Sequence, residues 1–355
     1  MRQYAAQDEA GAGPNHKPGG HRLADLLVHA RRPLVVLSGR DWSTRLLWTA
    51  VELVRRLNLP ACTDGATRGV LPRGDRHHVR LARRYAYANA DLIVSVGAPF
   101  DGSEVLSPDV TVVQIDLAHR TGDAPRPLGL GTVGDAGLVL EQVTAAASGR
   151  FGNGAALRTP WLDELRAAER IAVDKLRPHL RSDASPIHPY RLAGEIDGFL
   201  TEDSLCIADG GGIASFAEQV VHPKAPGSWL DPGPSAAPGA PGACIRDAVA
   251  ARRGRPGTEV VAVLGGGALD GTGKGVATLV RHDVPFIGIV AGSQQAVAQH
   301  EFARRLAGHG ETVRAPRAIG PALRRARASG RPSLITVWVD PDPYAHGTTN
   351  QNPYE

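Results

Sequence analysis

The stretch Pro33-Leu-Val-Val-Leu-Ser-Gly39 decides the fold class. It is an unbroken apolar run that ends in glycine, and strands of this kind are typically buried on both faces of a parallel sheet. A helical pattern precedes it at 23–30, and another follows at 44–57, where apolar residues recur at helical spacing. Helices that alternate with buried strands predict a doubly wound α/β domain.

The alternation continues along the chain and then begins again, so we predict two doubly wound parallel-sheet α/β domains. The first half adds expected strands at 59–63, 91–97 and 110–116 and a helix at 80–89. The second half has expected strands at 204–208, 259–264, 285–290 and 333–339, with helices at 161–180, 189–199, 213–221, 274–282, 298–306 and 319–328. The expected organisation is a flexible tail at 1–20, a first domain at 21–145, a linker and connecting helix at 146–185, a second domain at 186–340 and a C-terminal tail at 341–355.

Composition excludes several classes of protein. Of 355 residues, 42% are hydrophobic and 21% charged, which is incompatible with a wholly disordered chain. No apolar run reaches the roughly 20 residues that span a bilayer, and residues 1–20 hold no apolar signal core, so a cytoplasmic protein without membrane contact is expected. The densest basic stretches, 252–255 and 324–327, contain no aromatic residues, which favours solvated helix faces over nucleic-acid binding.

The second half contains an ordered series of motifs. They are Ile187-His-Pro-Tyr-Arg-Leu192, Ala208-Asp-Gly-Gly-Gly212, Pro226-Gly-Ser-Trp-Leu-Asp-Pro-Gly-Pro234, Val263-Leu-Gly-Gly-Gly267 and Thr278-Leu-Val-Arg-His-Asp-Val-Pro285. This series resembles the diphosphate-binding domain of thiamine-diphosphate (ThDP) enzymes, within the branch of 2-hydroxyacyl-CoA lyase, oxalyl-CoA decarboxylase and acetolactate synthase. The first half, with 33–39 and Ala90-Asp-Leu-Ile-Val-Ser-Val-Gly-Ala-Pro-Phe-Asp101, is similar to the central domain of the same family.

The resemblance implies a bound ThDP, and the sequence departs from what that cofactor needs. In the family an aspartate and an asparagine hold Mg²⁺ through oxygen ligands, whereas the matching positions here are Gly266 and the Gly292–Ser293 pair. The segment 235–238 lacks the large apolar residue that supports the bent cofactor. The glutamate that activates the cofactor belongs to a pyrimidine-binding domain, for which we expect no counterpart in this chain.

The remaining candidates for ligand binding lie in glycine-rich turns and beside strand ends. Lys274 would begin a helix and could replace part of the metal's charge, although a solvated lysine is the alternative. Asp270 is a candidate for a displaced metal ligand or a helix cap. For the first domain the resemblance implies a nucleotide such as the ADP part of coenzyme A, or FAD. Arg40 and Arg68 lie near expected strand ends and could bind its phosphates, or could simply be surface arginines. The candidate diphosphate site comprises Gly211, Gly212, Gly265, Gly266, Gly267, Lys274 and Ser293.

These observations leave three hypotheses about function. The first is a subunit of a heteromeric ThDP-type carbon–carbon lyase or carboligase, in which a partner chain supplies the pyrimidine domain and ThDP and Mg²⁺ bind only in the complex. The second is a non-catalytic structural or regulatory subunit that no longer binds ThDP or Mg²⁺. The third is an old fold that performs unrelated small-molecule chemistry. The first two imply a protein partner in a hetero-oligomer, with a homodimer as the alternative, and no catalytic residue is assigned.

Overall fold

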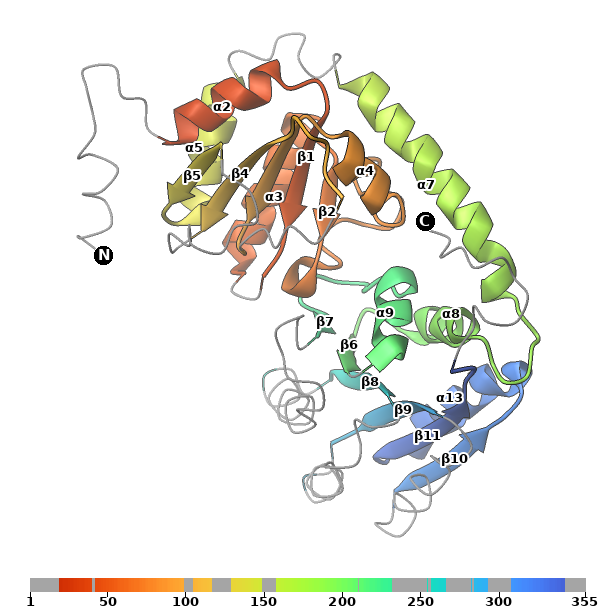
Figure 1. The fold of residues 1–355 in the computed structure, drawn as a ribbon. Helices are drawn as coiled ribbons and strands as arrows, with labels where there is room; N and C mark the ends of the chain where they lie inside the picture. The colour runs from red at the N-terminus through yellow and green to blue at the C-terminus, as the bar shows by residue number, and fades with distance from the viewer. Residues whose placement is uncertain are drawn as a thin grey trace. The chain divides into compact units, whose positions relative to one another are not determined.

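The computed structural model describes residues 19–39, 42–98, 105–116, 129–148, 158–209, 211–231, 257–265, 284–292 and 308–341, with the single residues 254 and 282. The chain divides into two compact units between Ala172 and Val173 (Figure 1). Each unit contains one parallel sheet, which confirms the predicted fold class. No helix in these ranges is long and apolar enough to cross a membrane.

The sheet of the first unit has the order β2-β1-β3-β4-β5, and every strand pair is parallel. From β1 the chain steps to β2 on one side and then to β3 on the other, so the strand order reverses between β1 and β3. All five residues of β1 are buried, as its apolar run predicts. The strands are β1 (Pro33–Leu37), β2 (Ala61–Thr63), β3 (Leu92–Val96), β4 (Thr111–Asp116) and β5 (Leu130–Val133).

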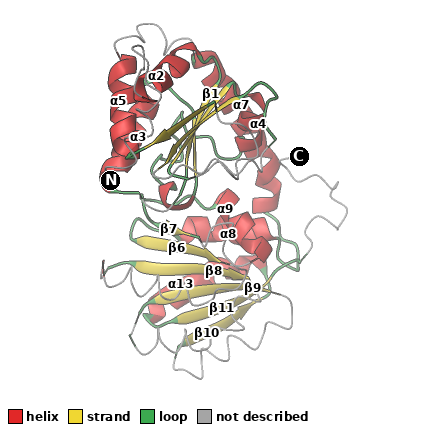
Figure 2. Ribbon diagram, turned by 60° about the vertical axis from the view of Figure 1, so that its left-hand side comes forward, coloured by secondary structure: helices red, strands yellow, loops and turns green. Residues whose placement is uncertain are grey.

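Helices cover both faces of this sheet. Alternate side chains of each strand point to opposite faces, so apolar residues on both faces need a covering helix. Val35 and Leu37 pack in one apolar cluster with α2 (Gly19–His29), α3 (Thr44–Arg56) and α5 (Ala136–Ser148). These three helices lie together on one side of the sheet in Figure 2. The intervening Leu34 and Val36 pack on the other face with α4 (Arg83–Asn89) and with the beginning of α7 (Thr159–Leu180).

The first part of α7 is fastened to this unit by polar contacts as well. The indole nitrogen of Trp161 donates to the carbonyl of Pro33 at 3.0 Å. The carboxylate of Glu169 accepts from the backbone N–H groups of Leu81 at 3.0 Å and Ala82 at 2.9 Å, directly before α4. The first unit therefore includes residues beyond 145, where its expected boundary lies.

The sheet of the second unit has the order β10-β11-β9-β8-β6-β7, again entirely parallel. Its strand order reverses between β6 and β8, because the chain moves from β6 outward to β7 and returns on the other side. Apolar residues of β6, β8, β9 and β11 form one core with α8, α9 and α13. The elements are α8 (Pro189–Phe199), β6 (Ser204–Asp209), α9 (Gly211–Val220), β7 (Trp229–Leu230), β8 (Glu259–Gly265), β9 (Phe286–Gly292), β10 (His309–Val313), α13 (Ile319–Ser329) and β11 (Ser333–Trp338), with short 3₁₀ turns η1 (Gly65–Thr67) and η4 (Pro316–Ala318).

Among the described α-helices and strands, four are not predicted by the sequence patterns: β5, α5, β7 and β10. Strand β10 reads His-Gly-Glu-Thr-Val and lies at a sheet edge, so it lacks an apolar run. Strand β7 has only two residues. The helices expected at 274–282 and 298–306 and the two tails lie almost wholly outside the residues that the structure describes.

Candidate cofactor site

The carboxyl edge of the second sheet holds the candidate diphosphate site. In open α/β sheets, ligands bind beyond the carboxyl ends of the strands at the point where the strand order reverses. Here that point lies between β6 and β8, whose ends pair through Asp209 and Leu264. Gly211 follows the end of β6 and Gly265 ends β8, so parts of two glycine-rich motifs singled out separately from the sequence lie at neighbouring strand ends.

The beginning of α9 offers backbone donors to an anion. Gly211 starts this ten-residue helix two residues after β6 ends. Gly212 is exposed, and a Cβ added there would meet no atom within 4 Å. Since the first N–H groups of a helix have no partner within the helix, a phosphate group could approach this open turn closely.

The last residues of β8 and β9 supply no side-chain ligand for a metal. Gly265 ends β8 and Gly292 ends β9, and these strands lie side by side through the Gly265–Ala291 pair. Within the described ranges, no group of three His, Cys, Asp or Glu residues could hold a metal ion. The described residues therefore fit a phosphate group better than they fit Mg²⁺. The candidates Gly266, Gly267, Asp270, Lys274 and Ser293 lie outside the described residues.

The motif at 187–192 has a structural role beside α9. His188 Nδ1 accepts from the N–H of Tyr190 at 3.1 Å and so caps α8. The hydroxyl of Tyr190 donates to Gln219 Oε1 on α9 at 2.6 Å, and its ring meets that of Phe216 edge-on. Burial lowers the pKa of His188 to about 4, and the adjacent His179 acts in the same direction. This motif joins α8 to α9 and so helps to position the candidate phosphate site.

Where the strand order of the first sheet reverses, the segments that follow β1 and β3 lie against each other at two glycines. Gly39 follows β1 and Gly97 follows β3, and both have positive φ, at +98° and +85°. A Cβ on Gly39 would lie 2.3 Å from the carbonyl oxygen of Gly97. Only glycine permits this contact between the strand ends. Arg40 lies outside the described residues, whereas Arg68 directly follows η1 and is partly buried.

A polar clamp that sequence reasoning missed holds the loop before Arg68. Thr67 Oγ1 donates to the carbonyl of Leu37 at 2.7 Å, and the N–H of Asp64 donates to Thr67 Oγ1 at 3.0 Å. The Asp64 carboxylate pairs with Arg83. Burial is the largest single influence on Arg83 and works against its charged form, but Asp64, Tyr87 and Cys62 together outweigh it, so the pKa of Arg83 is raised well above its usual value. Asp64 and Thr67 form a capping box at η1, but the spacing Asp64-x-x-Thr67 lacks the Glu or Gln of the usual sequence signature, so no sequence signal indicated the clamp.

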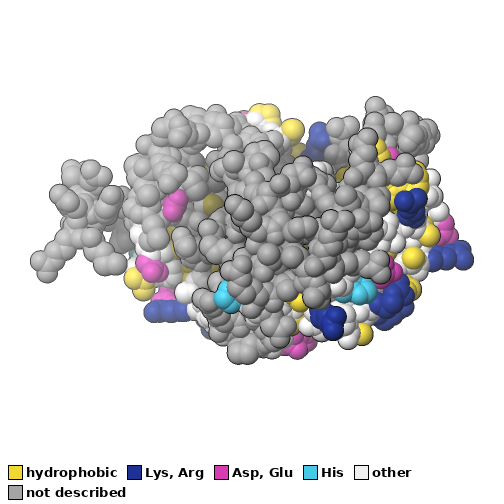
Figure 3. Space-filling view, turned by 90° about the horizontal axis from the view of Figure 1, so that it is seen from below, with side chains coloured by type: hydrophobic (Ala, Val, Ile, Leu, Met, Phe, Trp, Pro, Cys, Tyr) yellow, Lys and Arg dark blue, Asp and Glu magenta, His cyan; other side chains and the backbone are white. Residues whose placement is uncertain are grey.

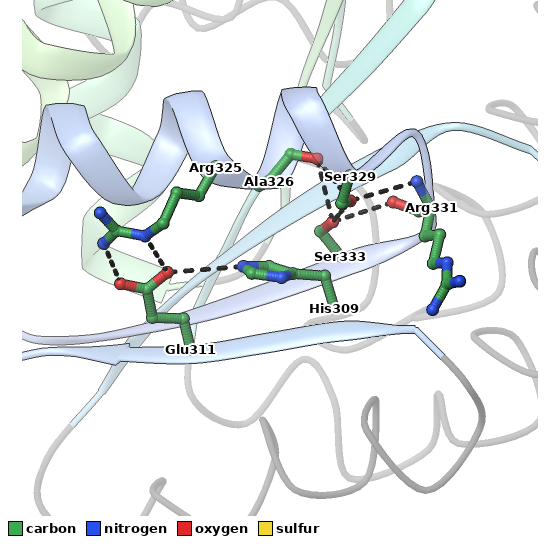
Figure 4. Close-up of polar contacts among 7 residues, drawn as sticks. All are labelled: His309, Glu311, Arg325, Ala326, Ser329, Arg331 and Ser333. Carbon is green, nitrogen blue, oxygen red and sulfur yellow. Dashed lines mark hydrogen bonds and ion pairs between the residues drawn. The ribbon is translucent and has the colours of Figure 1, made fainter.

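A second charged cluster lies near the amino ends of β10 and β11, away from the carboxyl edge (Figure 4). Arg325 on α13 donates to both carboxylate oxygens of Glu311, and His309 Nε2 lies 3.4 Å from Glu311 Oε2. The hydrogen bond from Arg325 lowers the pKa of Glu311. Beside them the Ser329 and Ser333 hydroxyls donate to the backbone carbonyls of Ala326 and Arg331. We interpret this cluster as fastening α13 to the edge strand.

Two of the three arginines of the basic stretch 324–327 take part in ion pairs. Besides the Arg325–Glu311 pair, Arg327 pairs with Glu259 at 2.6 Å. On the face shown in Figure 3, described basic side chains lie among acidic and apolar ones.

The first unit matches a known protein family. Residues 21–143 match the family described as "Thiamine pyrophosphate enzyme, central domain". This chain belongs to the thiamine pyrophosphate enzyme family. The finding confirms the resemblance drawn from the motifs, and enzymes of this family use ThDP, another name for thiamine pyrophosphate, with Mg²⁺.

Relatives in the family extend over the second unit as well. The chain is 32% identical to a probable acetolactate synthase of Mycobacterium bovis and to an acetolactate synthase large subunit of Mycobacterium tuberculosis, each alignment covering 95% of this chain and 64% of the relative. It is 31% identical to 2-hydroxyacyl-CoA lyase 2 of Xenopus laevis over 76% of this chain and 43% of that protein. The chain thus spans less than two thirds of the length of these relatives.

Proposed function

We propose that this chain is a component of a ThDP-type carbon–carbon lyase or carboligase that works with a partner chain. The partner would supply the pyrimidine domain and the activating glutamate. The observation that carries the proposal is the meeting of 208–212 and 263–265 at the strand reversal of the second sheet, beside the open first turn of α9. The names of the relatives, acetolactate synthase and 2-hydroxyacyl-CoA lyase, support this reaction class.

The residues of this chain would bind and orient the diphosphate. The first N–H groups of α9, at Gly211 and Gly212, would donate to phosphate oxygens, and the helix dipole would favour their charge. Lys274 would add positive charge where Gly266 cannot bind a metal. When bound, ThDP supplies the nucleophilic carbon for breaking or forming a bond next to a carbonyl group. In the first unit, Arg40 and Arg68 would meet the phosphates of an ADP-type nucleotide.

Calorimetric titration with ThDP and Mg²⁺, with and without a candidate partner chain, tests the proposal. The expected result is ThDP binding only in the mixture of the two chains. Absence of binding in both samples would contradict the proposal. The variant Gly212→Asp places a carboxylate at the open turn of α9, so it should reduce binding at least tenfold. The matched control is Gly198→Asp on α8, which is also exposed with nothing within 4 Å of an added Cβ.

A second candidate function is a non-catalytic subunit. It is favoured by the strand ends at Gly265 and Gly292, which carry no metal-binding side chain. In that case the same titration would show no ThDP binding, while the chain would still form a stable complex with its partner in light scattering.

A further inference from the structure

Two histidine rings lie against each other where the chain passes from α7 to α8. The ring centroids of His179 and His188 are 4.8 Å apart, and the ring of Tyr190 stacks on that of His188 at 5.6 Å. His188 is 9% exposed. Its Nδ1 accepts from the N–H of Tyr190, and its Nε2 has no hydrogen-bond partner among the described residues. This environment therefore suits a neutral imidazole.

The surroundings of His188 oppose its protonation. A proton on Nδ1 would point at the N–H of Tyr190, so the cap of α8 would be lost. Burial holds the pKa of His188 at about 4, His179 acts in the same direction, and Asp340, directly after β11, acts in the opposite direction without offsetting them. Burial also lowers the pKa of His179. His188 therefore takes up a proton far more readily once the first turn of α8 has opened to water.

The same segment contacts the helix of the candidate phosphate site. Helices α8 and α9 lie side by side in both views of the fold (Figures 1 and 2). The hydroxyl of Tyr190 donates to Gln219 Oε1 at 2.6 Å, and its ring meets that of Phe216 edge-on, with centroids 4.7 Å apart. Phe216 and Gln219 belong to α9, whose first turn begins at Gly211. Because α9 is one short helix, a displacement of Tyr190 is transmitted to that turn.

We propose that His188 and Tyr190 form an acid-sensitive switch that couples proton uptake before α8 to the position of α9. Protonation of His188 opens the first turn of α8, Tyr190 moves with that turn, and α9 loses its contacts with Tyr190. The consequence for cofactor binding, a weaker hold on diphosphate in acid, rests on the proposed function. The coupling between His188 and α9 does not depend on it.

Hydrogen exchange of the full chain at pH 7.5 and pH 5, corrected for the intrinsic pH dependence of exchange, tests the switch. The pKa of His188 is about 4 in the closed turn and 6.5 in water, so the open turn should gain about thirtyfold in population at pH 5. The amides of residues 190–192 should lose protection by that factor, and those of 214–220 by about threefold or more. Loss of protection at 190–192 alone overturns the proposal.

Two histidine variants identify the group that titrates. His188→Asn keeps an acceptor for the cap and does not ionise, so the pH dependence of exchange in both segments should disappear. His29→Asn is the matched control, because it replaces an exposed histidine on α2 of the first unit, and it should keep the parent profile. A parent-like profile in His188→Asn contradicts the switch.

The variant Tyr190→Phe tests the route from α8 to α9. It keeps the ring and removes the hydroxyl that donates to Gln219. At pH 7.5 the amides of 214–220 should already exchange faster than in the parent chain, while those of 190–192 should not. Equal exchange at 214–220 in the variant and the parent would show that Tyr190 does not connect the two helices.

Titration with ThDP in the presence of the partner chain separates the switch from the proposed function. Between pH 7.5 and pH 5, binding should weaken more in the parent chain than in His188→Asn, by about threefold or more. The diphosphate titrates equally in both samples, so the difference belongs to the protein. Identical pH profiles of binding would refute control of the cofactor site by His188. If ThDP binds at neither pH while exchange in α9 follows His188, the switch stands and the proposed function fails.

Discussion

At the residue scale, the contact between Gly39 and Gly97 leaves no room for a side chain at Gly39. We predict that Gly39→Ala lowers the free energy of unfolding of the first unit by about 2 kcal/mol or more, through positive φ and a clash with backbone. Gly74→Ala in the same unit is the control, because an added Cβ there meets nothing within 4 Å, and it should change stability little or raise it. Urea unfolding compares the two variants, and equal losses would contradict the prediction.

His188 makes the stability of the second unit depend on pH. It is 9% exposed, and its Nδ1 must stay unprotonated to cap α8. Its pKa is about 4 in the fold and about 6.5 in the unfolded chain, so the unfolded chain binds more protons between these values. The stabilisation is complete above pH 6.5 and disappears as the pH falls toward 4, a change of about 3 kcal/mol.

The variant His188→Asn separates capping from titration. Asparagine keeps a side-chain acceptor for the N–H of Tyr190 and does not ionise. Thermal melts between pH 7 and pH 4 should therefore show a shallower loss of stability in the variant than in the parent chain. Parallel curves would show that His188 is not the group that titrates.

At the element scale, Glu169 fastens the first part of α7 to the segment that precedes α4. Its carboxylate accepts from three consecutive backbone N–H groups, at Arg80, Leu81 and Ala82. Glu169→Ala would leave these donors without their acceptor, so we predict a loss of about 2 kcal/mol and faster hydrogen exchange at 80–82. Asp174→Ala, which removes only an exposed pair with Arg177, should have an effect below about 0.5 kcal/mol. Unchanged exchange at 80–82 would contradict the role assigned to Glu169.

The elements also show what sequence reasoning could and could not reach. Strand β1 and helix α8 were predictable because an apolar run and a proline at the helix start are local signals. Strand β10 was not, since an edge strand needs only one neighbour and can be polar. The glycines at the strand reversal were identified through their motifs. The contact of Glu169 with Leu81 joins residues 88 positions apart, and no local pattern encodes such a contact.

At the scale of the whole molecule, the division of the chain predicts which fragment can fold alone. Trp161 and Leu165 of α7 cover Leu34 and Ile93 on the second face of the first sheet. We predict that residues 19–172 fold with a cooperative thermal transition. A fragment of residues 19–148 leaves that face uncovered and should aggregate or melt without cooperativity. Circular dichroism measures the thermal transitions of both fragments. Cooperative melting of the shorter one would refute the role assigned to α7.

The fluorescence of Trp229 reports whether the edge of the second sheet is intact. Its indole is fully buried in the two-residue strand β7, and its ring nitrogen donates to Asp231 at 2.8 Å. Because emission from a shielded indole lies at shorter wavelength than emission from an indole in water, opening of this sheet edge would shift the fluorescence to the red. Trp161 in the first unit is also buried and Trp338 in the second is partly exposed, so comparison of the chain with a Trp229→Phe variant isolates the Trp229 signal.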